Sequence, residues 1–387
     1  MLNDLPTTER CNGCHACFQA CPVGAITMEV NAEGFLYPKI AEEKCINCGK
    51  CSRTCPLMNQ PQVNPMAEAR VCYARDPEIH SISSSGGIFA VLAEAILAEG
   101  GAVFGAVFDE NMQVCHQMAE DNRGLALLQQ TKYVQSIVGN TYADAEDALR
   151  RGRKVLFSGT PCQIAGLKSY LGSDHENLLT IDLICHGVPS PGIWARYLQE
   201  LTDGRPLKAV TFRNKQKGIR DVTLDYTLTD GQMIQEKYAD SLYIKGFIQN
   251  LYLRPSCHEC PFKGKLRCSD LTIGDFWGAK EYLPHMEHRN GVSAVLVHSA
   301  KGKMWLGRCA DALVMETTAI EKATVWNESL LKPAIPSPNR SSFWQDLDSV
   351  PLMDAIREHL IVPPVQRTSI SRCLISKLKG RIKKWLA

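Results

Sequence analysis

The sequence reads CNGCHACFQACP at residues 11–22 and CINCGKCSRTCP at residues 45–56. Both stretches follow the pattern C-x-x-C-x-x-C-x-x-x-C-P, and each cysteine of the second lies 34 residues after its counterpart in the first. This spacing is typical of cysteines that hold two 4Fe-4S clusters, because the fourth cysteine of each run binds the cluster of the other run. The predicted ligand sets are therefore crossed. One set is Cys11, Cys14, Cys17 and Cys55, and the other is Cys45, Cys48, Cys51 and Cys21.

Zinc binding and disulfide formation are the two other uses of closely spaced cysteines. Zinc sites usually pair two C-x-x-C units across a longer gap, whereas three cysteines recur here at a constant step of three. Disulfide frameworks are typical of short secreted chains, but this chain has 387 residues and its first residues do not form a secretory signal. We therefore predict a two-cluster ferredoxin-like module that handles single electrons.

The composition excludes several classes of protein. At 387 residues the chain is too long for a ferredoxin alone, and its length predicts two or three domains. The net charge of +2 gives no reason to expect a nucleic-acid partner. No apolar run approaches the ~20 residues that a membrane span needs. Because so many free thiolates favour a reducing compartment, we expect a cytoplasmic protein.

Four segments are expected along the chain. Residues 1–60 form the ferredoxin-like module, and residues 61–69 form a linker because their two prolines resist helix formation. Residues 70–330 alternate strands with helices and then form a hairpin, which predicts an α/β (α+β) multidomain fold with a largely parallel sheet. The expected strands are residues 69–74, 102–108, 155–157, 178–184 and 293–298, and the expected helices are residues 86–99, 142–151, 163–171 and 191–201.

The last segment, residues 331–387, is expected to be irregular up to a basic amphipathic helix at residues 371–387. Its apolar residues fall on one face, and six basic residues crowd the rest. Such a helix can make a peripheral contact with an anionic membrane surface or dock on an acidic partner. The alternative is a terminal helix that packs on its own domain with a solvated basic face.

A third group of cysteines lies beyond the middle of the chain. Cys257 and Cys260 form a C-x-x-C unit, and a basic insert separates them from Cys268. Positive charge in that insert would offset an anionic cluster. The best candidate for a fourth ligand is Cys185, at the C-terminal end of an expected strand. We expect a third 4Fe-4S cluster here, and structural zinc with Cys185 or His258 is the alternative.

Two strand-to-helix turns are candidates for binding an anionic cofactor. They read SSSGG at residues 83–87 and SGTPCQ at residues 158–163. Backbone N–H groups at such helix starts bind phosphate, and ligands of an open α/β sheet lie at the carboxyl ends of its strands. The alternative is ordinary capping by Ser, Gly and Pro. Within the second turn, Cys162 is either a reactive thiol with a lowered pKa or a small buried residue.

Seven segments occur in a fixed order. They are SSSGG at residues 83–87, KYVQS at 132–136, FSGTPCQIAGL at 157–167, CHGVPS at 185–190, FRNK at 212–215, CHEC at 257–260 and SDLTIGDFWG at 269–278. Together they resemble the beta-subunit family of the coenzyme F420-reducing hydrogenases and dehydrogenases, over about residues 1–300. One departure is Gly218-Ile219, where the family often continues to Gly-Trp.

The resemblance implies a flavoprotein, usually with FAD, beside a cysteine-bound 4Fe-4S cluster. It implies Cys185, Cys257, Cys260 and Cys268 as the ligands of the third cluster. The candidate catalytic groups are Cys162, His186 and Asp275, and His186 is also a candidate hydrogen-bond partner of a cluster sulfur. The implied flavin contacts are Ser84, Ser85, Gly86, Gly87, Lys132, Tyr133, Gln135, Ser136, Gly159, Thr160, Pro161, Cys162 and Gln163.

The prediction that follows is an iron-sulfur flavoprotein oxidoreductase. Electrons would pass from reduced ferredoxin through 4Fe-4S clusters to FAD, which joins one-electron carriers to an unknown two-electron acceptor. Many relatives look associated with polysaccharide biosynthesis, so we expect the acceptor there. The alternative is an electron-transfer subunit of a larger redox complex, related to coenzyme F420, without its own small-molecule substrate. A structural iron-sulfur protein that binds nucleic acid is disfavoured, because the chain has no basic stripe interleaved with aromatic residues.

Overall fold

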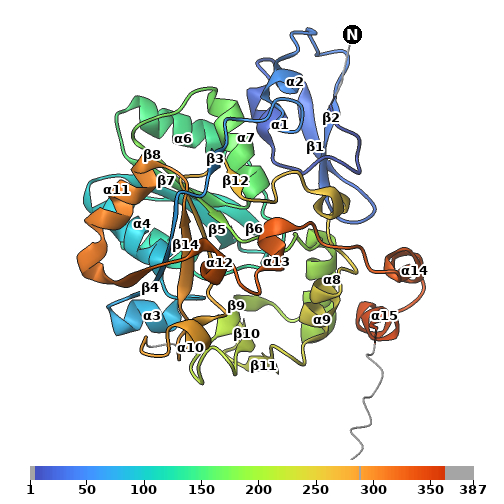
Figure 1. The fold of residues 1–387 in the computed structure, drawn as a ribbon. Coiled ribbons are helices and arrows are strands. Elements are labelled where there is room, and N and C mark those ends of the chain that lie inside the picture. Colours follow the sequence, from blue (N-terminus) through green and yellow to red (C-terminus); the bar gives the residue numbers. More distant parts are fainter. Residues whose placement is uncertain (1–4, 287–288, 362–387) are drawn as a thin grey trace, which may run out of the picture.

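The computed structural model describes residues 5–286 and 289–361. The basic helix expected at residues 371–387 therefore lies outside the described residues. Figure 1 shows a small N-terminal module, in blue, beside a larger body built around one sheet. The small module lies next to α6 (Thr141–Arg150) and α7 (Pro161–Leu171) of the larger body.

The N-terminal module repeats one local structure twice. A cysteine loop leads into α1 (Ala16–Ala20), and a second leads into α2 (Lys50–Thr54). Each helix begins after a residue with positive φ, His15 at 62° and Gly49 at 65°, and ends at the cysteine before the proline. Proline cannot continue a helix, so the chain turns away there. Between the two loops, β1 (Ile26–Val30) and β2 (Leu36–Ile40) form an antiparallel pair.

The larger body contains an eight-stranded sheet with the order β15-β4-β14-β13-β8-β7-β5-β6. The central strands β13, β8, β7 and β5 run parallel, whereas the flanking pairs are antiparallel. The predicted α/β fold class is confirmed, with a parallel centre and antiparallel edges. The strands are β4 (Glu68–Ala74), β5 (Ala102–Phe108), β6 (Val114–Ala119), β7 (Val155–Gly159), β8 (Leu178–Leu183), β13 (Leu271–Asp275), β14 (Ser293–Val297) and β15 (Leu313–Thr318).

Helices cover both faces of this sheet. On one face, α4 (Ile88–Ala98), α5 (Asn122–Leu128) and α11 (Ala300–Arg308) pack on the strands through buried residues such as Leu92 and Trp305. On the other face, α6 and α7 pack on Phe104 and Phe157. Burial of apolar side chains in these two layers supplies the main stabilisation of the fold.

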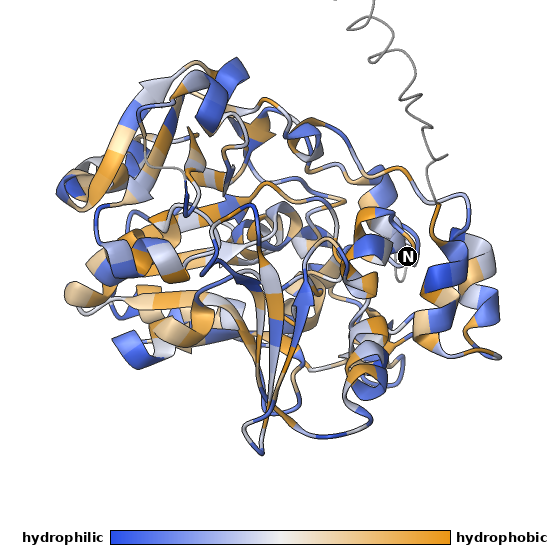
Figure 2. Ribbon diagram, turned by 90° about the horizontal axis from the view of Figure 1, so that it is seen from below, coloured by the Kyte–Doolittle hydropathy of each residue, from blue (hydrophilic) through white to orange (hydrophobic). Residues whose placement is uncertain are grey.

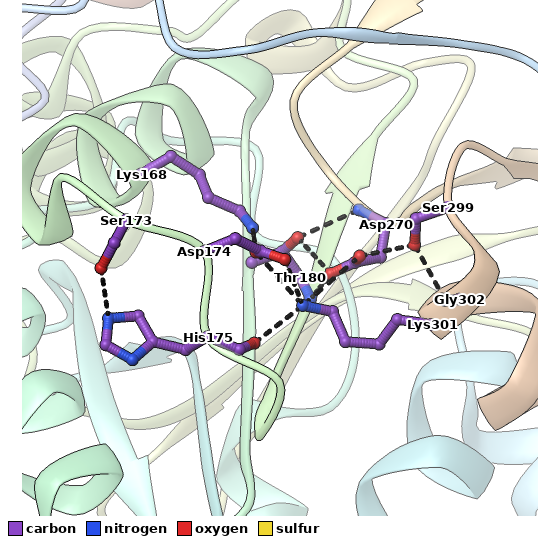
Figure 3. Close-up of polar contacts among 9 residues, drawn as sticks. All are labelled: Lys168, Ser173, Asp174, His175, Thr180, Asp270, Ser299, Lys301 and Gly302. Carbon is purple, nitrogen blue, oxygen red and sulfur yellow. Dashed lines mark hydrogen bonds and ion pairs between the residues drawn. The ribbon is translucent and has the colours of Figure 1, made fainter.

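A polar network ties the sheet to α11 at the amino end of β13 (Figure 3). The Asp270 carboxylate accepts hydrogen bonds from the Thr180 backbone N–H and hydroxyl, both at 2.8 Å, and from the Ser299 hydroxyl at 2.6 Å. Lys301 lies 3.8 Å from the same carboxylate and pairs with Asp174 at 3.3 Å. Because each of these groups has a partner within the network, we assign it a structural role.

A second, smaller sheet extends the larger body. It consists of β9 (Leu207–Asn214), β10 (Thr223–Leu228) and β11 (Met233–Lys237), and the predicted hairpin is its β10–β11 pair. An aromatic core joins it to α8 (Pro191–Thr202) and α9 (Leu242–Ile248). Figure 2 shows apolar and hydrophilic residues alternating along the helices, as expected when one face of each helix packs on a core.

The expectation of an irregular segment after residue 330 is wrong for its described part. Two helices form there, α14 (Arg340–Asp346) and α15 (Leu352–His359), and Figure 1 shows them near α8 and α9. Phe343 and Ile356 are fully buried in the aromatic core. The Glu200 carboxylate of α8 accepts the first backbone N–H groups of α15. The helices are short, so they depend on this tertiary packing rather than on helix propensity.

The expected linker is paired with the larger body. Within residues 61–69, β3 (Asn64–Pro65) pairs antiparallel with β12 (Leu266–Arg267), and β4 already begins at Glu68. Proline is tolerated in such a short edge strand because no ladder hydrogen bond needs its missing N–H. The predicted domain boundaries themselves stay a prediction.

Candidate iron-sulfur and flavin sites

A pocket in the N-terminal module is lined by Cys11, Cys14, Cys17 and Cys55. Three of these thiols come from the first cysteine run and one from the second, which is the crossed set expected from the sequence. Burial raises the pKa of the Cys17 thiol to about 12, and the neighbouring Cys11 and Cys55 contribute to the increase. Apolar residues such as Leu57 complete the wall. Four convergent thiols in an apolar pocket fit a 4Fe-4S cluster.

The second predicted set lies nearer the surface. Cys21 ends α1, Cys45 and Cys48 precede α2, and Cys51 lies in its first turn. Cys48 is exposed, whereas the other three are half-buried. The Ala25 backbone N–H donates to the Cys21 sulfur at 3.2 Å. Hydrogen bonds of this kind to ligand sulfurs tune the potential of iron-sulfur clusters.

A third pocket is lined by Cys162, Cys185, Cys257 and Cys260. Cys162 is the second residue of α7, and Cys185 follows β8, so two neighbouring parallel strands bring these thiols to one edge of the sheet. Cys257 and Cys260 come from a 3-10 turn, η1 (Pro255–Glu259), and the residue after it. The Val188 backbone N–H points at the Cys257 sulfur at 3.4 Å.

This set differs from the expected ligands by one member. Cys268 does not line the pocket, and the charged groups that affect its thiol are Asp182, Lys168 and Arg267. Cys162 was expected at the flavin, either as a reactive thiol with a lowered pKa or as a small buried residue. Burial raises the pKa of the Cys162 thiol well above its usual value, and the neighbouring Cys260 adds to the increase, which favours the buried residue. The helix-dipole effect is thus outweighed by burial among other thiols.

Two cations line the third pocket, Arg254 and Lys263. Lys263 belongs to the basic insert, and its ammonium donates to the Cys185 carbonyl and, at 2.7 Å, to the Ser329 carbonyl. Positive charge therefore lies where an anionic cluster would need it. Within residues 5–286 and 289–361, no group of three or more His, Cys, Asp or Glu side chains is arranged to hold a metal ion directly.

The glycines of the first candidate turn are required by packing. A Cβ on Gly86 would lie 2.3 Å from the Cys72 carbonyl oxygen and 2.8 Å from the Ser293 nitrogen. Gly87 has φ of 90°, which other residues rarely adopt. The hydroxyls are also engaged within the chain. The Ser84 oxygen accepts the Thr131 N–H at 2.7 Å, and Ser85 donates to the Val292 carbonyl at 3.2 Å.

The second turn is held by hydrogen bonds within itself, and one hydrogen bond joins it to the KYVQS segment. Thr160 and Gln163 form a capping box at the start of α7, with Pro161 at its first position and Gly159 just before. The Gln163 amide also donates to the Ser136 carbonyl at 3.2 Å. Ordinary capping accounts for the contacts between Thr160 and Gln163, and flavin binding by these residues stays a prediction. Lys132 donates to the carbonyls of Leu127 and Gln129, Gln135 donates to the Asn12 carbonyl, and Tyr133 packs on Phe212 and Phe247.

His116 is a buried residue that the sequence did not single out. Its ring lies 2.6 Å from the Ser136 hydroxyl and 3.0 Å from the Ser158 carbonyl, and it stacks on Phe157. Burial lowers the pKa of His116 to about 4, so the ring is neutral at pH 7. Nothing in the sequence pattern distinguishes it, because it is an inward residue of a strand.

The remaining candidate catalytic groups are engaged in pairs. His186 lines the third pocket, and its ring lies 2.6 Å from the Asn250 side-chain oxygen. Asp275, at the end of β13, forms a largely buried ion pair with Arg213 at 2.8 Å. Lys215, in the same FRNK segment as Arg213, donates to the Ser85 carbonyl at 2.9 Å, and burial lowers the pKa of its ammonium to about 7. These contacts join β9 to the carboxyl edge of the large sheet.

Comparison with known families identifies both parts of the chain. Residues 10–58 match the 4Fe-4S dicluster domain. Residues 152–323 match the family described as the C terminus of the beta subunit of coenzyme F420 hydrogenase/dehydrogenase. The predicted resemblance to this beta-subunit family is confirmed over residues 152–323. The predicted iron-sulfur, electron-transferring oxidoreductase class is thereby confirmed for this beta-subunit homologue, whereas no comparison supports the expected link to polysaccharide biosynthesis.

Two curated proteins are similar to parts of this beta-subunit homologue. The F subunit of the F(420)H(2) dehydrogenase of Methanosarcina mazei is 25% identical over 185 residues, which is 45% of this chain and 53% of that protein. The chain therefore spans about half the length of that relative. The VorC subunit of the ketoisovalerate oxidoreductase of Methanothermobacter marburgensis is 36% identical over 56 residues, 14% of this chain and 71% of that protein.

One solved structure is also similar to this beta-subunit homologue. It is a chain of the F420-reducing NiFe hydrogenase complex from Methanosarcina barkeri, which aligns with a TM-score of 0.46 and 18% identity. The alignment covers 77% of this chain and 90% of that one. In the part of the chain that the structure describes, no helix has the length and apolar character needed to cross a membrane.

Proposed function

We propose that this chain is the iron-sulfur electron-transfer subunit of an oxidoreductase complex related to the coenzyme F420 hydrogenases and dehydrogenases. The observation that carries the proposal is the proximity of two thiol pockets. Asn12 lines both the pocket of Cys11, Cys14, Cys17 and Cys55 and the pocket of Cys162, Cys185, Cys257 and Cys260. Two neighbouring cluster sites provide a route for single electrons from the N-terminal module into the larger body.

The order of the three cluster sites along the route follows from how exposed their thiols are. The second thiol set includes the exposed Cys48, so a redox partner such as ferredoxin would exchange electrons there. The first pocket lies deeper in the same module, and Cys14 packs against Gly166 of α7 in the larger body. The third pocket follows at the carboxyl edge of β7 and β8. The sites thus lead from the surface toward the edge where open α/β sheets bind their ligands.

We propose Cys162, rather than Cys268, as the fourth ligand of a third 4Fe-4S cluster. Cys162 lines the same pocket as Cys185, Cys257 and Cys260, whereas Cys268 does not. The cations Arg254 and Lys263 beside these thiols would offset the negative charge of a cluster. Cys162 then serves the cluster and not the flavin.

FAD is part of the proposal through family membership. When bound, a flavin would couple one-electron carriers to two-electron chemistry. Family resemblance supports Ser84, Ser85, Lys132 and Gly159 as contacts, near the carboxyl edge of β5 and β7. Lys132 would be suited to hold an anionic cofactor, because its half-buried ammonium bonds only to two carbonyls and pairs with no carboxylate among the described residues.

The names of the curated relatives favour an electron-transfer subunit over a self-contained enzyme. Both relatives are subunits of larger oxidoreductases. The chain would therefore pass electrons within an assembly and need no small-molecule acceptor of its own. Its partners would be other subunits and a soluble redox protein.

The test is to purify the chain anaerobically and to measure iron, acid-labile sulfide and flavin per chain. Three clusters predict about twelve iron and twelve sulfide, because each cube contains four of each. The isolated chain should accept electrons from reduced ferredoxin and pass them to an artificial dye. It should reduce coenzyme F420 or other two-electron acceptors only when its partner subunits are added. Rapid turnover of such an acceptor by the isolated chain would contradict the proposal.

A further inference from the structure

Arg254 joins the two modules from inside. It lies just before η1 and is 1% exposed. Its guanidinium crosses to the N-terminal module, where it donates to the carbonyls of Cys11 at 2.7 Å and Leu36 at 2.9 Å. A third bond, at 2.9 Å, reaches the Gln135 side-chain oxygen. The ring of Tyr37 stacks 4.1 Å from the guanidinium carbon.

The same residue is connected to the ligand loops of both pockets. On one side, its guanidinium holds the carbonyl of Cys11 and occupies the space beside Gly13, where a Cβ would lie 2.7 Å from it. On the other side, the Arg254 carbonyl accepts the Cys257 N–H at 2.9 Å, and Arg254 lines the third pocket. One residue therefore sets the position of a cysteine loop in each module.

The charge of Arg254 has no carboxylate partner among the described residues. Among the ion pairs between described residues, none includes Arg254. Nearby Arg340 also reaches the N-terminal module, but unlike Arg254 it forms an ion pair there, with Glu33. Burying a cation without a counter-charge is costly, so a buried arginine is normally paired. Two clusters with four thiolates each would supply negative charge on both sides of the guanidinium.

We propose that Arg254 couples the first and third cluster sites, as a positioning residue that docks their loops and raises the reduction potential of both. The inference rests on the proposed function, which places a cluster in each pocket. A reduced cluster carries one more negative charge than an oxidised one, so a nearby buried cation favours the reduced state. Because the same cation lies between both sites, it would raise both potentials, and its loss would lower both.

The test compares Arg254→Gln, Arg254→Lys and Arg340→Gln in the full chain loaded with clusters. Potentials are read by redox titration with electron paramagnetic resonance. Loss of the charge in Arg254→Gln should lower the ratio of reduced to oxidised cluster about tenfold at a fixed potential, which is about 59 mV for a one-electron couple. Arg254→Lys keeps the charge and should retain potentials near those of the wild type. Arg340→Gln loosens the same module contact but removes a paired charge, and should leave both potentials unchanged.

Several results would overturn the coupling. Unchanged potentials in Arg254→Gln would show that the charge does not affect the clusters. An equal shift of the potentials in Arg340→Gln would show that the effect comes from docking of the modules alone. If Arg254→Gln does not fold, Arg254→Lys decides: potentials that fall despite the retained charge would refute the proposal. A wild-type chain with only about eight iron instead contradicts the third cluster, and this outcome is visible before any variant is made.

Discussion

Replacing Cys162 with alanine removes one of the four thiols that line the pocket between α7, the end of β8 and η1. Alanine is preferred to serine because a hydroxyl could itself bind iron. The thiols of Cys185, Cys257 and Cys260 would remain. A cube that has lost one of its four thiolates is expected to be unstable, so the variant should lose one complete cluster.

The size of the loss follows from the three thiol sets. The wild type should contain about twelve iron and twelve sulfide per chain, and Cys162→Ala should contain about eight of each. The matched control is Cys268→Ala, because Cys268 is the member of the expected set that lies outside this pocket. It should keep all three clusters. Cys185→Ala, which removes a thiol of the pocket from another element, should resemble Cys162→Ala.

The assay is anaerobic reconstitution followed by iron and sulfide analysis and electron paramagnetic resonance of the reduced chain. Circular dichroism would show that each variant is folded. A full iron content in Cys162→Ala together with a loss of about four iron in Cys268→Ala would refute the ligand assignment and restore the set expected from the sequence. A full content of about twelve iron in both variants would show that neither Cys162 nor Cys268 is needed to hold a cluster.

Three further predictions concern the packing of the modules and the effect of pH. Gly166→Ala places a Cβ 3.0 Å from the Cys14 Cβ and 2.9 Å from the Tyr142 hydroxyl, so we expect ~1–3 kcal/mol lower unfolding free energy in urea, and an unchanged midpoint would contradict it. Gly86→Ala should destabilise the whole larger body because of the Cys72 carbonyl, and selective loss of flavin with normal thermal stability would instead support a cofactor role. The pKa of His116 is about 4 when folded and 6.5 when exposed, so the unfolded chain binds more protons as the pH falls. Between about pH 7.5 and about pH 5 the free energy of unfolding should fall by ~2 kcal/mol because of this group. In a His116→Gln variant, the unfolding free energy measured by urea titration should fall less steeply with decreasing pH.

The elements with a strong local signal could be predicted from the sequence. The cysteine runs, β5 at Ala102–Phe108 and the hairpin were expected at nearly their observed positions, because spacing and turn residues determine them locally. The helices α14 and α15 were missed. They are short and are stabilised by residues far along the chain, such as Glu200. No local pattern records a contact of that kind.

One residue of the third pocket could not be predicted for the same reason, because its position depends on contacts that are distant in the sequence. Cys268 follows Cys260 closely in sequence, which favoured it as a ligand, whereas Cys162 lies far upstream. A usable signal existed: Cys162 and Cys185 each follow a buried strand, and neighbouring parallel strands end at the same edge. Strand order, which decides that neighbourhood, is not local information. Arg254 gave no signal at all, because its role depends on the docking of two modules.

The close packing of the N-terminal module on the larger body affects the rate of electron transfer between them. Gly166 lets α7 touch the Cys14 loop, Gly34 lies against Gly192 at the start of α8, and the Ser190 hydroxyl donates to the Glu33 carbonyl. A free ferredoxin must find its partner by collision, so its electron delivery slows as the protein is diluted. Here the carrier is part of the acceptor, so internal transfer would proceed at a rate that dilution does not change. Only the first encounter, at the surface near Cys48, would remain a second-order event.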